Sequence, residues 1–180
     1  VLSRRQRQMC IRDRVRSTNN TAIRIIKKTN CKYGMVISET QTNGKGQYGR
    51  KWISYKGNLF VTFFHELNKI KLSIATITKL NCLLIKKLIS KYTNKKILYK
   101  KPNDLFIDKK KICGILQEII FMQNKKYLIT GIGININKSP YIKKCPTTNL
   151  NELTNKHIKI NEIEKSLKQI FENNLLKISI

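Results

Sequence analysis

The sequence predicts an α+β domain in which a mixed, largely antiparallel sheet carries helices on one side. Two long segments, Leu72–Tyr92 and Asn161–Leu176, have apolar residues at helical spacing. The chain has more short apolar runs rich in β-formers than helices. Parallel neighbours need a crossover, usually a helix, to connect them, and there are too few helices for that. Most neighbouring strands must therefore pair in antiparallel order, with the helices packed on the sheet. A chain of 180 residues fits one domain with a sizeable core.

The other expected elements follow from local patterns along the chain. A Ser-Thr pair is a suitable N-cap for a first helix over about Asn19–Lys28. The segments Asp104–Ile107 and Lys111–Phe121 are predicted to form a hairpin, because a short polar turn separates two runs of β-formers. Further strands are expected at Gly34–Ser38, Asn58–Phe64, Ile97–Tyr99 and from Tyr127 onward.

The first fourteen residues differ in composition from the rest of the chain. Seven of the eight arginines fall between Arg4 and Arg24, whereas no lysine occurs before Lys27. We therefore expect Val1–Arg14 to be a non-native segment or a disordered basic tail, and residues 15–180 to form the domain.

The net charge of +27 first suggests a nucleic-acid partner. A nucleotide-binding P-loop is excluded, because no G-x-x-x-x-G-K-[ST] motif occurs. The lysines are spread through the sequence instead of forming one block, and no RNP-type aromatic boxes occur. We therefore expect no specific nucleic-acid partner, although a basic RNA-binding module remains an alternative from another functional class. The same charge would steer association with an acidic protein.

Cysteine and hydropathy patterns narrow the range of functions. The five cysteines form no C-x-x-C pair, which argues against zinc binding and indicates reduced thiols in a cytoplasmic protein. Neither histidine lies in a ligand motif, and Cys113 is expected to be a buried apolar residue. No run of eighteen apolar residues is present, so we expect no membrane span.

The most informative segment is Gln41–Trp52, which reads QTNGKGQYGRKW. It combines three glycines with three cations in one short loop. Glycine lets backbone N–H groups turn inward and form a concave site for an anion, which the neighbouring cations then help to neutralise. Four further motifs accompany this loop, namely RSTNN at Arg16–Asn20, KKPNDL at Lys100–Leu105, KICGILQEIIF at Lys111–Phe121 and YLITGIGININ at Tyr127–Asn137.

These motifs, in this order, resemble the catalytic domain of biotin–protein ligases, over roughly Val15–Ile178. The resemblance implies a fold related to class II aminoacyl-tRNA synthetases. It implies an enzyme that activates biotin with ATP and Mg²⁺ as biotinyl-AMP and transfers it to a lysine of an acidic biotin carboxyl carrier domain. It also implies a monofunctional form without the DNA-binding domain or the C-terminal β-barrel of some members. The sequence leaves open whether the chain forms a homodimer.

A lipoate– or octanoate–protein ligase of the same fold is the nearest alternative, but its Arg-Arg-x-Gly-Gly-Gly run is absent. The resemblance assigns biotin binding to Ser17, Thr18, Asn19, Gln41, Lys45, Gly46, Gln47, Lys111 and Gly131. It assigns adenylate binding to Lys45, Gln47, Arg50, Lys51, Trp52, Asn103, Asp104 and Asn135. It assigns catalysis to Lys111, Arg50 and Asp104, with Asp104 as the magnesium ligand.

Several of these residues also have a purely structural explanation. Ser17 and Thr18 suit a helix N-cap, Asn103 and Asp104 suit an Asx turn, and Lys111 suits a solvated turn.

Gln41, by contrast, suits a urea group of a ligand, because an amide both donates and accepts hydrogen bonds. The sequence departs from the family pattern in three places. Lys45 and Gln47 replace the arginines of the Arg-Gly-Arg triplet, and Lys101 replaces a tryptophan.

Overall fold

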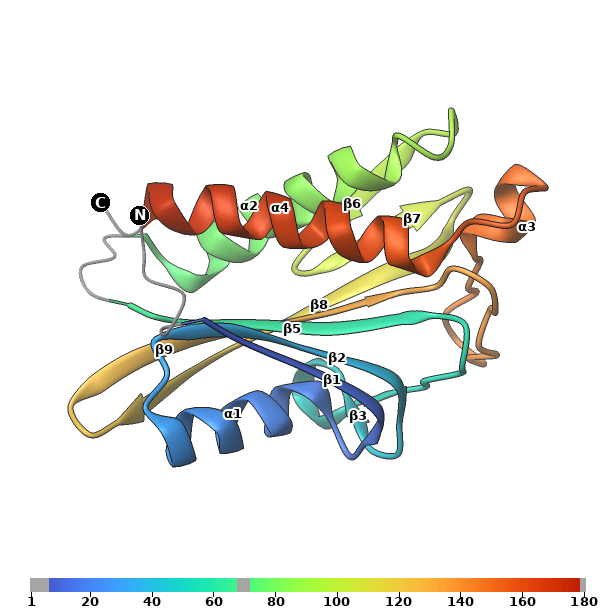
Figure 1. Ribbon diagram of the computed structural model, residues 1–180. Coiled ribbons are helices and arrows are strands. Elements are labelled where there is room, and N and C mark those ends of the chain that lie inside the picture. Colours follow the sequence, from blue (N-terminus) through green and yellow to red (C-terminus); the bar gives the residue numbers. More distant parts are fainter. Residues whose placement is uncertain (1–6, 68–71, 179–180) are drawn as a thin grey trace.

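The computed structural model describes residues 7–67 and 72–178 of the chain (Figure 1). The strands of the main sheet are β1 (Arg7–Val15), β2 (Tyr33–Gln41), β5 (Leu59–Glu66), β6 (Ile97–Lys100), β7 (Asp104–Ile107), β8 (Lys110–Met122) and β9 (Lys125–Ile134). A small hairpin consists of β3 (Gly44–Lys45) and β4 (Lys51–Trp52), with the 3₁₀ turn η2 (Gln47–Gly49) between them. The helices are α1 (Thr18–Thr29), α2 (Ile74–Ile89), α3 (Leu150–Thr154) and α4 (Ile160–Ile178).

The strand order of the sheet is β1-β2-β5-β9-β8-β7-β6. Strands β1 and β2 are parallel, and the other neighbouring pairs are antiparallel. The predicted mixed, largely antiparallel sheet is therefore confirmed. The predicted hairpin is also present, since β7 and β8 are joined through Asp108 and Lys109, which both have the positive φ angles of a tight hairpin turn.

Helices cover both faces of the sheet, whereas the sequence predicted helices on one side. Figure 1 shows α1 and β3 on one side of the sheet and α2 and α4 on the other. In β5 nearly every residue is buried, so side chains pointing to both faces are covered. On the α1 face, Ala22 and Ile26 pack against Val36, Phe64 and Ile129.

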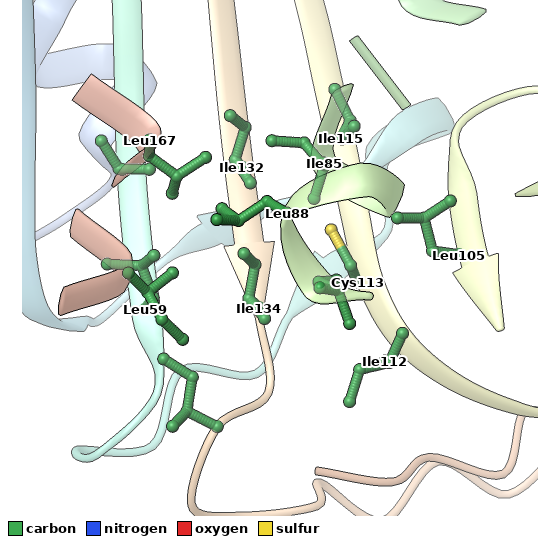
Figure 2. Packing of buried hydrophobic residues seen from close by; sticks show 14 of the residues in the cluster. Leu59, Ile85, Leu88, Leu105, Ile112, Cys113, Ile115, Ile132, Ile134 and Leu167 are labelled. Carbon is green, nitrogen blue, oxygen red and sulfur yellow. The ribbon is translucent and has the colours of Figure 1, made fainter. Parts of the chain in front are cut away.

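The larger core lies between the sheet and helices α2 and α4. Figure 2 shows Ile85 and Leu88 of α2 and Leu167 of α4 above apolar residues of β5, β8 and β9. The ring of Phe171 stacks on Phe63 with 4.0 Å between the ring centroids. The helices α2 and α4 thus cover the central strands on one face of the sheet.

The first helix begins as its sequence predicts. The backbone N–H of Asn20 donates to the Ser17 hydroxyl at 3.5 Å, so Ser17 is the N-cap of α1. Helix α3 was not predicted, because it has only five residues and little periodicity. Its N-cap is Asn149, whose side chain accepts a hydrogen bond from the backbone N–H of Glu152.

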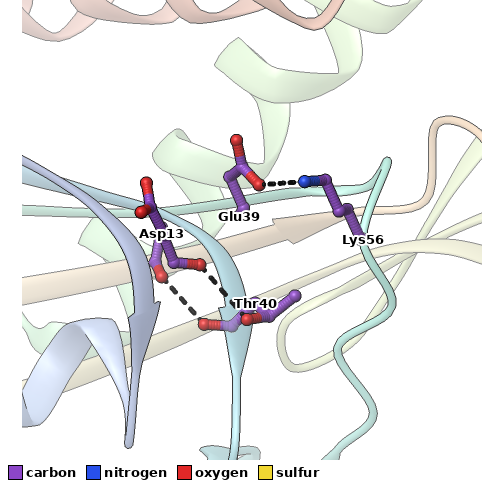
Figure 3. A network of polar contacts seen from close by, with 5 residues as sticks. Asp13, Glu39, Thr40 and Lys56 are labelled. Atoms are coloured by element: carbon purple, nitrogen blue, oxygen red, sulfur yellow. Dashed lines mark hydrogen bonds and ion pairs between the residues drawn. The ribbon is translucent and has the colours of Figure 1, made fainter.

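Residues 7–14, for which the composition predicted a non-native segment or a disordered tail, lie in a strand. They extend β1, which pairs with β2 along its length. Figure 3 shows the Thr40 hydroxyl of β2 donating to the backbone carbonyl of Asp13 at 3.2 Å, beside an ion pair between Lys56 and Glu39. Because strand pairing uses backbone groups, an edge strand forms with side chains that contribute little to the core. Met9 and Ile11 are accordingly exposed.

Two of the cysteines, Cys82 and Cys113, and the histidine His65 are buried. Burial raises the pKa of the Cys82 thiol to about 12 and that of Cys113 well above its usual value, so both stay protonated. As predicted, Cys113 is a fully buried core residue. Burial lowers the pKa of His65 to about 4, so its ring is neutral at pH 7. Among the described residues, no helix is long and apolar enough to cross a membrane.

Deletion of Val1–Arg14 tests whether β1 contributes to the domain. We expect the deletion to lower the melting temperature by at least about 3 °C, because the outer edge of β2 loses its hydrogen-bonding partner. Differential scanning calorimetry measures this change. The substitution Ile11→Thr, at an exposed position of the same strand, is the control and should leave the melting temperature unchanged. A truncated chain as stable as the full chain would instead support the non-native tail.

Candidate functional site

One pocket on the α1 side of the sheet brings together residues that are far apart in the sequence. It lies between the start of α1, the glycine-rich loop and strands β7, β8 and β9. From the predicted site residues it gathers Ser17, Thr18, Asn19, Gln41, Lys45, Gly46, Trp52, Asn103, Asp104, Lys111 and Gly131. It also includes residues that were not assigned a role, namely Gly114, Ile115, Leu116, Ile132 and Gly133.

The floor of the pocket is a pair of glycines on neighbouring strands. Gly114 of β8 and Gly133 of β9 are directly opposite each other in the ladder. The indole of Trp52 lies on this pair: a Cβ atom on Gly114 would be 2.5 Å from the ring, and one on Gly133 would also collide with it. Only glycine therefore lets the tryptophan approach the sheet this closely.

A β-bulge determines which face of the sheet Lys111 occupies. Leu105 pairs with Cys113, but the next residue of β7, Phe106, pairs with Lys111, so Ile112 is an extra residue in β8. Ile112 and Cys113 both lie in the main core. In a regular strand Lys111 would point to the same face as Cys113. The bulge instead directs Lys111 into the pocket, a common use of bulges beside functional sites.

At the end of the pocket near β7 and β8, three side chains lie close together: Lys111, Asp104 and Trp52. The Lys111 ammonium lies 2.7 Å from the Asp104 carboxylate, and these side chains are 17% and 23% exposed. The same ammonium lies 5.1 Å from the centre of the Trp52 ring, within the range of a cation–π contact. Lys111 is thus a positioned cation in a partly buried site, where its charge is screened less than on the surface.

The opposite end of the pocket is held by hydrogen bonds of Gln41. Its Oε1 atom accepts from the Thr18 backbone N–H at 2.8 Å and from the Thr18 hydroxyl at 3.1 Å. Its Nε2 atom donates to the Ser54 hydroxyl at 3.0 Å. The amide orientation is therefore fixed, and the Thr18 hydroxyl keeps free lone pairs with which it can accept from a ligand N–H.

Asn19 is fixed beneath this end by residues that the sequence did not identify. Its Nδ2 atom donates to Glu118 at 2.7 Å, and its Oδ1 atom accepts from the Thr62 hydroxyl at 2.6 Å. A side chain at Gly131 would collide with the same Oδ1 atom. Asn19 is 3% exposed. Its contacts thus anchor the start of α1 to the sheet.

In the KKPNDL segment, Asn103 and Asp104 have different roles. Asn103 is mostly buried, and its Nδ2 atom donates to the Ile115 carbonyl at 2.6 Å, while its own carbonyl accepts from the Ile115 N–H at 3.0 Å. Asn103 therefore fixes the turn to β8. Asp104, the next residue, opens β7 and points toward Lys111.

Four predicted site residues lie outside the pocket lining. Gln47, Arg50 and Lys51 belong to the η2 turn and the hairpin beyond it, and the last two are exposed. Asn135 is 1% exposed, and its Nδ2 atom donates to the backbone carbonyls of Thr148 and Lys111. It thus supports the backbone of Lys111 from behind.

Some residues at the site were not predicted, and the sequence contains only partial signals for them. Gly114 and Glu118 lie within the quoted KICGILQE motif, yet a motif does not show which neighbour each will contact. Ser54 and Thr62 stand in ordinary strand or loop surroundings. Their contacts with Gln41 and Asn19 join segments that only the fold brings together.

The lining of the pocket offers one carboxylate to a magnesium ion, that of Asp104. The described residues hold no group of three His, Cys, Asp or Glu side chains that would bind a metal by themselves. Magnesium, however, is commonly bound by one or two carboxylates together with waters and substrate phosphates. Asp104, at the pocket and partly exposed, fits that mode of binding.

Comparison with known proteins identifies the family. The sequence profile of the Biotin/lipoate A/B protein ligase family matches residues 11–135. This match covers more than half of the chain, and the chain belongs to this family of ligases.

Within the family, the similarity is to biotin protein ligases. The chain is 28% identical over 130 residues to the bifunctional ligase/repressor BirA of Bacillus subtilis, covering 71% of this chain and 40% of the relative. It is 29% identical over 102 residues to BirA of Escherichia coli, covering 56% of this chain and 32% of the relative. The chain thus spans a third to two fifths of the length of these relatives.

Solved structures give the same result. The biotin protein ligase of Aquifex aeolicus in complex with biotin and ATP superposes with a TM-score of 0.79 at 27% identity, covering 96% of this chain and 72% of that chain. Plasmodium falciparum LipL1 in complex with lipoate superposes with a TM-score of 0.58 at 15% identity, over 93% of this chain and 63% of that chain. The second similarity shows the shared fold alone.

The substitution Gly133→Ala tests the glycine floor. The added methyl group should push the Trp52 ring off the sheet, lowering stability by about 1–3 kcal/mol as overpacking does. Trp52 is the chain's one tryptophan, so its emission should shift to longer wavelength as the ring becomes exposed. In the control, Gly46→Ala, the nearest atom to the new Cβ is the Arg50 carbonyl oxygen at 3.3 Å, and the emission should shift less. Equal emission shifts in the two variants would contradict the contact between the Trp52 ring and the glycine pair.

Proposed function

We propose that this chain is a biotin–protein ligase: it activates biotin with ATP as biotinyl-AMP and transfers the biotinyl group to a lysine of a carrier domain. One observation carries the proposal, namely that a single pocket joins the Thr18–Gln41 pair to the cation Lys111. The Thr18–Gln41 end suits a urea group, which both donates and accepts hydrogen bonds. The Lys111 end suits the carboxylate at the other end of the same small molecule.

The first step joins two anions. A carboxylate oxygen of biotin attacks the α-phosphorus of ATP, and the bond to the β-phosphate oxygen breaks, releasing pyrophosphate. Such a step needs charge neutralisation and alignment more than a protein nucleophile. Lys111 is a fixed cation in a partly buried site, so it lowers the repulsion between the carboxylate and the phosphate. The buried thiols of Cys82 and Cys113 stay protonated, so neither acts as a nucleophile in this chemistry.

Asp104 is the residue that would hold Mg²⁺ together with the phosphates of ATP. The ion supplies neutralising charge to the phosphates when it is bound. Asp104 also positions Lys111 through the ion pair at 2.7 Å. Arg50 and Lys51 lie on the exposed hairpin, from which they contribute to phosphate binding when the loop lies over the nucleotide.

The second step transfers the activated acyl group. The ε-amine of the carrier lysine attacks the acyl carbon of biotinyl-AMP, the bond to the phosphate oxygen breaks, and AMP and a proton leave. The net charge of +27 favours an acidic carrier domain, because opposite charge accelerates the encounter of two proteins. The glycine-rich loop contributes three exposed cations to this charge, all on the hairpin beside the pocket: Lys45, Arg50 and Lys51.

The isotope exchange of pyrophosphate into ATP tests the first step without a carrier. We expect exchange that depends on biotin and magnesium, because adenylate formation is reversible. Lipoate and octanoate serve as matched controls and should support little exchange. Exchange with either of them but not with biotin would assign the chain to the lipoate branch of the family instead.

Lys111→Ala should slow adenylate formation by at least about tenfold, since a charge-assisted hydrogen bond contributes about 1.5–3 kcal/mol. Lys111→Arg keeps the charge and should retain more activity. Lys109 is exposed and has a φ angle of 62°, so Lys109→Asn is the control that removes a nearby lysine without backbone strain. Single-turnover kinetics measures the step, and a melting curve verifies folding. Equal small effects at both positions would make Lys111 part of a solvated basic turn.

A further inference from the structure

The Ser54 hydroxyl closes the base of the glycine-rich loop. The loop leaves β2 after Gln41 and returns at Ser54. The hydroxyl accepts a hydrogen bond from Gln41 Nε2 at 3.0 Å and donates one to the Trp52 carbonyl at 3.3 Å. We call these two hydrogen bonds the loop clasp. One side chain thus joins the strand that precedes the loop to the strand that ends it.

The loop clasp also fixes the polarity that the pocket presents to a ligand. A hydroxyl has one hydrogen, and Ser54 directs it to the Trp52 carbonyl, so its oxygen is left to accept from the Gln41 amide. The Nε2 atom of Gln41 must then face Ser54, which leaves Oε1 facing both donors of Thr18. The hydrogen bonds of Thr18, Gln41 and Ser54 consequently form one directed chain.

Trp52 connects the other end of this chain to the reacting groups. Its carbonyl accepts from Ser54, while its ring lies on Gly114 and Gly133 and 5.1 Å from the Lys111 ammonium. Ser54 is therefore linked through hydrogen bonds to the urea-binding end of the pocket and through Trp52 to its cationic end.

The packing around Gly44 supports the loop clasp independently. A Cβ atom at Gly44 would be 2.5 Å from the Trp52 carbonyl oxygen and 3.0 Å from both Gln41 Nε2 and Ser54 Oγ. The backbone of β3 is therefore pressed against the three groups that form the loop clasp. Such close packing leaves these groups little freedom to take other positions.

The free space in the pocket makes this restraint relevant to binding. The cavity measures about 50 Å³. Pockets for small organic ligands usually measure about 300–1,000 Å³. A bicyclic ligand needs more room than this, and the hairpin of β3 and β4 forms one wall of the pocket through Lys45, Gly46 and Trp52. The loop clasp lies at the base of that hairpin, where its hydrogen bonds restrain the position of this wall.

We propose that Ser54 is a positioning residue that couples the glycine-rich loop to the ligand-binding amide of Gln41. It holds the Gln41 amide in one orientation and holds Trp52 over the glycine floor. Ser54 does not touch the reacting atoms. The part of this inference that concerns ligand affinity rests on the proposed biotin ligase function, whereas the part that concerns Trp52 does not.

The test compares Ser54→Ala with Ser54→Thr, which keeps the hydroxyl, in the full chain. Ser90→Ala is the matched control, because its hydroxyl also donates to a backbone carbonyl, that of Lys87 at 2.9 Å, but at the end of α2. Acrylamide quenching of Trp52, the one tryptophan, reports the freedom of the loop without any ligand. Ser54→Cys, with a weaker donor of similar size, replaces Ser54→Ala in case the latter does not fold.

Ser54→Ala should raise the quenching constant at least about twofold and weaken biotin binding about tenfold, the effect of losing a partly buried hydrogen-bond partner. Calorimetry measures the binding. Ser54→Thr and Ser90→Ala should match the unmodified chain in both measurements. Wild-type quenching and biotin affinity in Ser54→Ala would refute the proposal while the ligase function stands. Failure of the unmodified chain to bind biotin would instead refute the ligase function, and quenching alone would then decide the role of Ser54.

Discussion

The contact between Trp52 and the glycine pair Gly114 and Gly133 is the constraint on which the site depends. The two glycines face each other across β8 and β9, so the sheet has a flat, side-chain-free area there. The indole occupies that area and thereby brings the hairpin of β3 and β4 down onto the sheet. The hairpin carries Lys45 and Gly46 into the pocket wall. A methyl group on either glycine would therefore alter the loop, the pocket and the surroundings of Lys111 together.

The position of Lys111 depends on a second departure from regular structure. A strand alternates its side chains, and Cys113 belongs to the core between the sheet and helix α2. One extra residue, Ile112, brings Lys111 to the opposite face without sacrificing the core contacts of either neighbour. The backbone of Lys111 is held in turn by Pro146 and Thr148. The cation is thus fixed by the sheet on one side and by a loop on the other, which is the preorganisation that electrostatic catalysis requires.

Local chemistry made much of this arrangement predictable. The N-cap at Ser17, the hairpin before Lys111 and the helical spacing of α2 depend on neighbours in the sequence, and all three are present. The motifs also identified most residues that the pocket gathers. What failed depends on the fold as a whole. An edge strand pairs through its backbone, so β1 left no trace in side-chain composition. Asn135 is buried behind Lys111 with hydrogen bonds to the Lys111 and Thr148 carbonyls, and these contacts join segments that no motif connects.

The charges of this basic chain fall into two groups, the cations on its surface and the ion pair of Lys111 and Asp104 at the pocket. The sequence has 37 Lys and Arg but 10 Asp and Glu. Carboxylates are therefore scarce, yet Asp104 and Glu118 both lie at the pocket or directly beneath it, paired with Lys111 and Asn19. The surface excess of cations acts over about 8–10 Å and is screened by salt, so it affects encounter with a partner. The partly buried pair is screened less and fixes one cation in place. Under the proposed function, encounter with the carrier should depend strongly on ionic strength, whereas the proposed chemical step should depend on the geometry around Lys111.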